Sequence, residues 1–293
     1  MAGHDRGERW MIFKPRARRP RSYVVAIGVV FMCQWVPGGG WSAGAQGWTG
    51  RGAATLSGGG ATAARAEAGS GGRSAGVRPG CPDNLADRLS STGKARQLLT
   101  VSAESFTTSV ATVEAWRLID STAGPSCWRK AGGPWTALIG TNGFSDHHRE
   151  GDRTTPTGIY AIGPVMYGNA PNPGTHYPYH RLVCGDWWDE APTSPEYNTF
   201  QHIPCGQAAP FGGDSEALWT ETVDYPSLAV IEYNSHPVVP YAGSAIFIHA
   251  EDGKPTTGCV SLPLADLDRI LRWLAPSASP KVAMGPLSEL PRF

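Results

Sequence analysis

A histidine and a cysteine lie ten residues apart near the C-terminus, in the segment IFIHAEDGKPTTGCVSLP. His249 ends an apolar run, and a short polar loop leads from it to Cys259 in a Thr-Gly-Cys turn. A cysteine nucleophile needs a base for its proton and donors for the oxyanion. His249 would be the base, and the amides of Gly258 and Cys259 would be the donors. The spacing alone leaves a buried structural thiol or a disulfide as alternatives.

The number of cysteines favours a free thiol at position 259. Five cysteines follow residue 80: Cys81, Cys127, Cys184, Cys205 and Cys259. Disulfides use cysteines in pairs, so an odd number leaves one over. The third and fourth bracket a polar insert with little strand or helix patterning, and the first can pin the start of the folded part to the second. We expect these two disulfides, although four cysteines allow other pairings.

The N-terminus has the pattern of an export segment. Basic residues between positions 14 and 21 precede the apolar stretch 23–36 (YVVAIGVVFMCQWV). This stretch is shorter than the roughly 20 apolar residues of a membrane-spanning helix. The Ala-Gly-Ala at 43–45 fits a cleavage site. We predict a signal peptide over residues 1–45, with an uncleaved N-terminal anchor as the alternative, and a secreted or cell-envelope location for the rest.

Composition and charge change sharply along the chain. Residues 46–80 are mostly Gly, Ala, Ser, Thr and Arg, which predicts a flexible linker before a folded domain at 81–293. Residues 1–80 hold 11 of the 25 Lys/Arg but only 3 of the 25 Asp/Glu, so residues 81–293 hold 14 and 22. Nucleic-acid affinity comes mainly from Lys and Arg, so this acidic part is not expected to bind nucleic acid. Membrane contact is expected only through the N-terminal segment.

Short strand-like runs separated by turn residues dominate the folded part. The best strand candidates are residues 97–103, 111–119, 135–140, 158–163, 227–234 and 245–250. One amphipathic helix follows Cys259, and a shorter one is expected at 84–89. The apolar positions of the longer helix are Leu264, Leu267, Ile270, Leu271 and Leu274. We therefore predict a mainly β domain with a C-terminal helix packed on the sheet, in which His249 ends a rigid strand.

Two motifs resemble those of the YkuD-type L,D-transpeptidases. Residues 256–261 (TTGCVS), with His249 upstream, are similar to the family's Ser/Thr-x-Gly-Cys turn. Residues 151–163 (GDRTTPTGIYAIG) are similar to its Gly-Asp-x-x-Thr-Pro-x-Gly segment. The likeness covers residues 97–285 and is closest to secreted versions from high-GC Gram-positive bacteria. It implies a YkuD-like β-sandwich catalytic domain.

The resemblance also implies a reaction on peptidoglycan stem peptides that needs no metal or organic cofactor. His249 would take the proton of Cys259, with the carbonyl of Ala250 orienting the imidazole. The thiolate would attack the carbonyl of the diamino acid's L-centre and expel the terminal D-alanine. Transfer of the thioester to a neighbouring amine gives a 3-3 cross-link, whereas water gives an L,D-carboxypeptidase. Carbapenems are expected to acylate Cys259. A non-catalytic, disulfide-rich wall-binding module is the remaining alternative.

The chain departs from the family pattern on both sides of Cys259. Thr257 stands where the family usually has a second histidine, and Ser261 stands where Arg or Asn is common. We expect both to contact substrate. We also expect Thr257 to alter substrate choice while Cys259 remains the nucleophile.

Three further residues are substrate-binding candidates, each with structural packing as the alternative. Tyr233 ends a strand that can neighbour that of His249, and Asp186 and Trp187 lie in the polar insert, which can form a lid. The pairs His147-His148 and His176 with His180 could suggest metal ligands. The spacing of His176 and His180 suits a metal only on a helix, and the proline between them disfavours one. No metal site is expected.

Overall fold

The computed structural model describes residues 79–212 and 215–293. The predicted signal peptide (1–45) and most of the predicted linker (46–78) lie outside these residues. Within the described ranges no helix is long and apolar enough to cross a membrane. The predicted mainly β fold with a C-terminal helix is confirmed.

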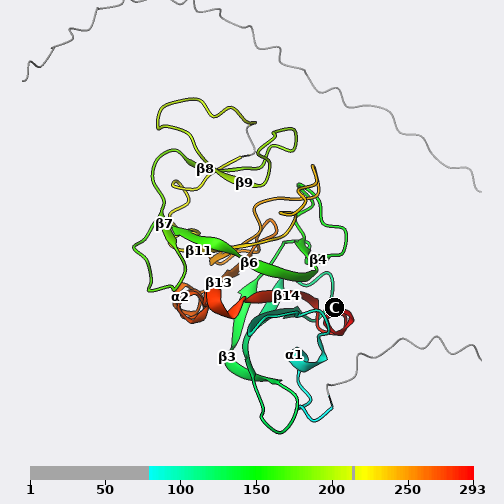
Figure 1. Cartoon of the computed structure of the whole chain (residues 1–293). Coiled ribbons are helices and arrows are strands. Elements are labelled where there is room, and N and C mark those ends of the chain that lie inside the picture. Colours follow the sequence, from blue (N-terminus) through cyan, green and yellow to red (C-terminus); the bar gives the residue numbers. More distant parts are fainter. Residues whose placement is uncertain (1–78, 213–214) are drawn as a thin grey trace, which may run out of the picture. The chain divides into compact units, whose positions relative to one another are not determined.

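Among the described residues, nine strands form one sheet that closes on itself (Figure 1). Their order is β11-β12-β13-β3-β2-β1-β14-β6-β7, and β11 also pairs with β6. The strands are β1 (Gln97–Ala103), β2 (Val110–Ile119), β3 (Cys127–Leu138), β6 (Gly158–Gly168), β7 (Tyr179–Arg181), β11 (Leu228–Ile231), β12 (Phe247–Ala250), β13 (Val260–Leu262) and β14 (Lys281–Pro286). Because β11, the first strand of this order, pairs with β6, the last but one, the sheet wraps around a core.

Strand β1 shows why the sheet is buried on two faces. Alternate residues of a strand point to opposite faces. Leu99 and Val101 belong to the main core, whereas Leu98 packs in a second cluster with Trp128. That second cluster lies under the short helix α1 (Leu85–Arg88) and the 3-10 helix η2 (Leu290–Arg292).

Helix α2 (Leu264–Trp273) packs on β12 and β13, the two strands that flank the polar loop. Leu267, Ile270, Leu271 and Leu274 are fully buried, as the helical spacing predicted. Leu264, the first residue of the helix, is 46% exposed. The 3-10 helix η1 (Pro276–Ala278) then leads into β14.

Two small sheets complete the described part of the domain. One pairs β4 (Phe144–Ser145) with β5 (Thr155–Pro156). The other has the order β10-β8-β9 and lies between β7 and β11 (Figure 1). Its strands are β8 (Asp186–Asp189), β9 (Thr199–His202) and β10 (Glu216–Ala217). The polar insert between Cys184 and Cys205 is part of this longer segment, residues 182–227, which is called the insert below. The sequence showed no strand pattern here, because these short strands are held by cross-links and buried polar contacts rather than by alternating apolar residues.

Both predicted disulfides are present. Cys81 pairs with Cys127 and Cys184 with Cys205, while Cys259 is free and buried. The first disulfide fastens the start of the domain to β3, and the second closes the insert around β8 and β9. A carboxylate near the first disulfide does not make it a metal site, since bonded sulfurs are not thiolate ligands.

Candidate active site

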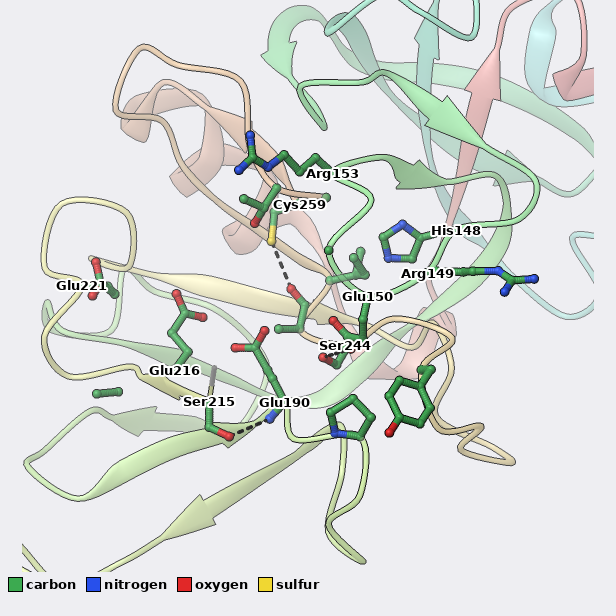
Figure 2. Close-up of a pocket in the computed structure, with 18 of the residues that line it drawn as sticks. His148, Arg149, Glu150, Arg153, Glu190, Ser215, Glu216, Glu221, Ser244 and Cys259 are labelled. Carbon is green, nitrogen blue, oxygen red and sulfur yellow. Dashed lines mark hydrogen bonds between the residues drawn. The ribbon is translucent and has the colours of Figure 1, made fainter. Parts of the chain in front are cut away.

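Cys259 lies at the wall of a cavity of about 850 Å³, immediately before β13 (Figure 2). Strands β12 and β13 run parallel, and His249 is paired with Ser261. Because side chains two residues apart share a face of a sheet, His249 and Cys259 lie on the same face as diagonal neighbours. The fold therefore brings together the two residues that the sequence singled out.

The Cys259 thiol is held by two backbone groups. Its Sγ donates to the carbonyl of Ala245 at 3.1 Å and accepts from the amide of Phe247 at 3.3 Å. Burial raises the pKa of Cys259 well above its usual value, although the Phe247 amide acts in the opposite direction. Nearby carboxylates, with Glu216 the largest, raise the pKa further. In the free protein this cysteine is therefore a protonated thiol.

The imidazole of His249 is fixed in one orientation. Its Nδ1 lies 2.7 Å from the carbonyl oxygen of Ala250. A carbonyl only accepts, so Nδ1 carries the hydrogen and Nε2 keeps its lone pair. Burial lowers the pKa of His249 to about 4, against the opposing effect of the Ala250 and Asp224 carbonyls. The result is a neutral, oriented imidazole on the same sheet face as a neutral thiol.

A tyrosine and a glutamate that the sequence analysis missed support this imidazole. The ring of Tyr225 meets that of His249 edge-on at 5.3 Å. Its hydroxyl donates to both carboxylate oxygens of Glu216, each at 2.8 Å. Burial raises the pKa of Glu216 to about 7. No motif in the sequence marks either residue. Glu216 comes to the site from strand β10 of the insert, far along the chain from Cys259.

The turn before Cys259 is closed by its own threonine. Thr256 Oγ1 donates to the carbonyl of Cys259 at 2.7 Å and accepts from the amide of Gly258 at 3.1 Å. The single N–H of Gly258 is thus engaged within the turn, and the oxyanion role expected of it from the sequence stays a prediction. Gly258 itself is required by crowding, because a Cβ here would lie 3.0 Å from Ile246 Cδ1 and 3.1 Å from Thr154 O.

The second sequence motif meets this turn in space. Thr155, fully buried, donates its hydroxyl to the carbonyl of Gly258 at 2.8 Å. The same hydroxyl accepts the amide of Gly140 at 2.8 Å. One side chain therefore joins β5, the end of the β3 segment and the cysteine turn, which explains why the Thr-Pro motif accompanies the Gly-Cys motif.

The cavity is lined by both acidic and basic side chains. Figure 2 shows Glu216 and Glu221 on one side of Cys259, and His148 and Arg149 on the other. The acidic side comes from the insert. The other side comes from the loop that precedes β5, which brings Arg149 and Arg153 to the cavity together with Glu150. A substrate with both an amine and a carboxylate would find a partner for each.

The remaining predicted residues near Cys259 have different surroundings. Thr257 lines the cavity. Ser261 is buried, and its hydroxyl has no hydrogen-bond partner in the part of the chain that the structure describes. Tyr233 does not line the cavity; its hydroxyl donates to the carbonyl of Ala242, and its ring packs on His148.

Asp186 and Trp187 also lie away from the cavity lining. Both oxygens of Asp186 are used inside the insert, where they accept from His180 Nε2 at 2.8 Å and His202 Nδ1 at 2.6 Å. Trp187 packs edge-on against Trp219 at 5.0 Å. Their contacts hold the insert together.

Asn198 connects the insert to the loops around the thiol. No pattern in the sequence indicates this role. Its Nδ2 donates to the carbonyls of Tyr233 and Asn234, each at 3.0 Å. Its Oδ1 accepts from the amide of Ala245 at 3.0 Å. The carbonyl of Ala245 accepts from the thiol of Cys259, so Ala245 alone connects Asn198 of the insert to the nucleophile candidate.

The fold and the site define an enzyme domain in which a mainly β scaffold presents a free thiol at a charged cavity and holds an oriented imidazole on the same face of the sheet. The chain belongs to the YkuD family, whose sequence model, the L,D-transpeptidase catalytic domain, matches residues 127–283. This confirms the family that the two motifs indicated. Neither a curated protein nor a solved structure shows a significant match to the chain.

Proposed function

We propose that this protein is a secreted L,D-transpeptidase that uses Cys259 as nucleophile and His249 as its base. The observation that supports this most directly is the place of Cys259. It is the free thiol among the described cysteines, and it lies at a cavity on the same sheet face as an oriented imidazole. Membership of a family that acts on peptidoglycan peptides supports the substrate class. Two disulfides fit an extracytoplasmic location.

In the first step Cys259 gives its proton to His249 Nε2 as its sulfur attacks the carbonyl of the stem's diamino acid at the L-centre. The bond to the terminal D-alanine breaks, and that amine leaves with the proton from His249. A thioester to Cys259 remains. The Phe247 amide already donates to the sulfur, so it can stabilise negative charge on the sulfur during the transfer.

In the second step an amine of a neighbouring stem takes the acyl group, which gives a 3-3 cross-link. Attack by water in place of the amine gives an L,D-carboxypeptidase on the same scaffold. The acidic side of the cavity favours the amine, because carboxylates attract a cationic acceptor.

Intact mass after addition of a carbapenem tests the nucleophile. The wild-type protein should gain the mass of one carbapenem, and Cys259→Ala should gain none. An adduct on the alanine variant, or none on the wild type, would overturn the proposal. Mass analysis of digested stem peptides then separates 3-3 dimers from trimmed monomers. A count of free thiols in the unreduced protein addresses the wall-binding alternative, which requires position 259 to be bridged or inert.

A further inference from the structure

A second histidine faces the cavity from a different part of the chain. His148 lies in the loop before β5, is 8% exposed, and lines the cavity together with Thr257 and Cys259 (Figure 2). His249 does not line the cavity. An acceptor that enters through the cavity therefore meets His148, whereas His249 approaches Cys259 from within the sheet.

The ring of His148 has a defined tautomer. Its Nδ1 lies 3.1 Å from Asp152 Oδ1 and 3.1 Å from Thr154 Oγ1. The Thr154 hydroxyl donates to the same carboxylate oxygen at 2.8 Å. Since a carboxylate only accepts, Nδ1 carries the hydrogen and Nε2 keeps a lone pair. Nε2 has no hydrogen-bond partner within residues 79–212 or 215–293. It is not among the fully buried polar atoms that lack a partner.

Packing holds this ring against the cysteine turn. Tyr233 meets it edge-on at 5.3 Å. Two glycines leave room for it: a Cβ on Gly243 would lie 2.4 Å from His148 Nε2, and a Cβ on Gly258 would lie 3.5 Å from its Cε1. The edge of the ring that carries Nε2 and Cε1 thus lies between Gly243, in the segment before β12, and the turn that carries Cys259.

The turn itself offers no second base. Residue 257, two places before Cys259, is a threonine, whose hydroxyl does not accept a proton at neutral pH. Burial lowers the pKa of His148, with Asp152 and Glu150 opposing the shift, so the imidazole is neutral at neutral pH. The titratable groups that face it are Asp152 and Glu150 from its own loop and Tyr233 from the segment after β11.

We propose that His148 is the general base that deprotonates the acceptor amine, oriented by Asp152. This assignment rests on the transpeptidase function proposed above. The amine nitrogen forms a bond to the thioester carbonyl carbon, and its proton passes to His148 Nε2. The carbon–sulfur bond then breaks, and the thiolate of Cys259 leaves. The proton returns from His148 to that thiolate, which restores the free enzyme.

The test measures the two half-reactions separately in the full-length protein by intact mass. A donor stem tetrapeptide forms the thioester, and its decay is followed with and without an amine acceptor. His148→Gln should acylate at nearly the wild-type rate but transfer to the amine on the order of 10²-fold more slowly. The matched control is His147→Gln, since His147 is the exposed neighbour in the same loop. Its two rates should match those of the wild type.

Asp152→Asn gives a second, independent variant that leaves His148 in place. It should slow aminolysis by a smaller factor and shift the pH profile of that step alone. If His148→Gln slows acylation as much as aminolysis, the histidine acts on the thiol, and the assignment is wrong. Unchanged aminolysis in both variants also overturns it. A wild-type protein that forms no thioester overturns the transpeptidase function itself, and this inference with it.

Discussion

At the scale of single residues, the site depends on side chains that connect segments far apart in sequence. Thr155 is the clearest case, because its hydroxyl bonds both the amide of Gly140 after β3 and the carbonyl of Gly258 in the cysteine turn. His249 and Cys259 are held in the same way, by backbone carbonyls rather than by each other. The chemistry therefore depends on how rigidly the backbone holds these partners.

Thr155→Val should reveal this dependence. The substitution keeps the shape but leaves the amide of Gly140 and the carbonyl of Gly258 without their partner. We expect a loss of about 1–3 kcal/mol in the free energy of unfolding and a slower acylation by carbapenem. Thr155→Ser, which keeps the hydroxyl, is the control. Equal stability and equal rates in the valine and serine variants would show that this hydroxyl has no role.

At the scale of elements, the insert between β7 and β11 forms part of the site. Its small sheet carries Glu216 to the cavity wall, and Glu190 lines the cavity directly after β8. Asp186 and the Cys184–Cys205 disulfide hold the insert together, and Asn198 attaches it to the segment before β12. The acidic half of the cavity thus comes from an element that has no recognisable pattern in the sequence.

Asn198→Ala tests that attachment. It removes four hydrogen bonds of a buried side chain, so we expect a loss on the order of 3 kcal/mol in the free energy of unfolding, measured with urea. Asn198→Asp keeps the acceptor oxygen but loses both donors and should fall between the alanine variant and the wild type. Slower acylation should accompany each loss. An alanine variant as stable as the wild type would show that the insert is held by other contacts.

At the scale of the whole molecule, the site imposes opposing pH dependences on stability. The pKa of His249 is lowered to about 4 from 6.5, so the unfolded state binds more protons in that interval and stability falls as pH drops through it. The pKa of Glu216 is raised to about 7 from 4.5, so its contribution is present below pH 4.5 and is lost as pH rises towards 7. The two effects offset each other between these limits.

Glu216→Gln should remove one side of this balance. Relative to the wild type, the variant's free energy of unfolding should rise between pH 4.5 and pH 7, by on the order of 3 kcal/mol. Urea unfolding at several pH values across this interval measures the difference. Parallel curves for the two proteins would mean that Glu216 does not hold a proton in the folded state.

Much of this protein was determined by local sequence. Apolar spacing located helix α2, alternation located most of the main strands, cysteine number indicated a free Cys259, and two motifs indicated the family. The apolar run predicts a strand to residue 234, but β11 ends at Ile231, because the amide of Tyr233 donates to the carbonyl of Ile231 in a tight turn.

Only the tertiary structure decided which side chains surround the thiol. His148, Glu216 and Tyr225 line the cavity from three separate segments, and Asn198 bonds to the amide of Ala245. No local pattern marks the last three, and the sequence drew attention to His148 only as the neighbour of His147. Tyr233, Asp186 and Trp187 form packing and hydrogen-bonding contacts away from the cavity instead. The physical reason is that periodicity records which face of an element is buried, whereas a cavity is defined by contacts between distant segments. At residue 257 the sequence showed only a missing histidine, and the fold places His148 beside that turn.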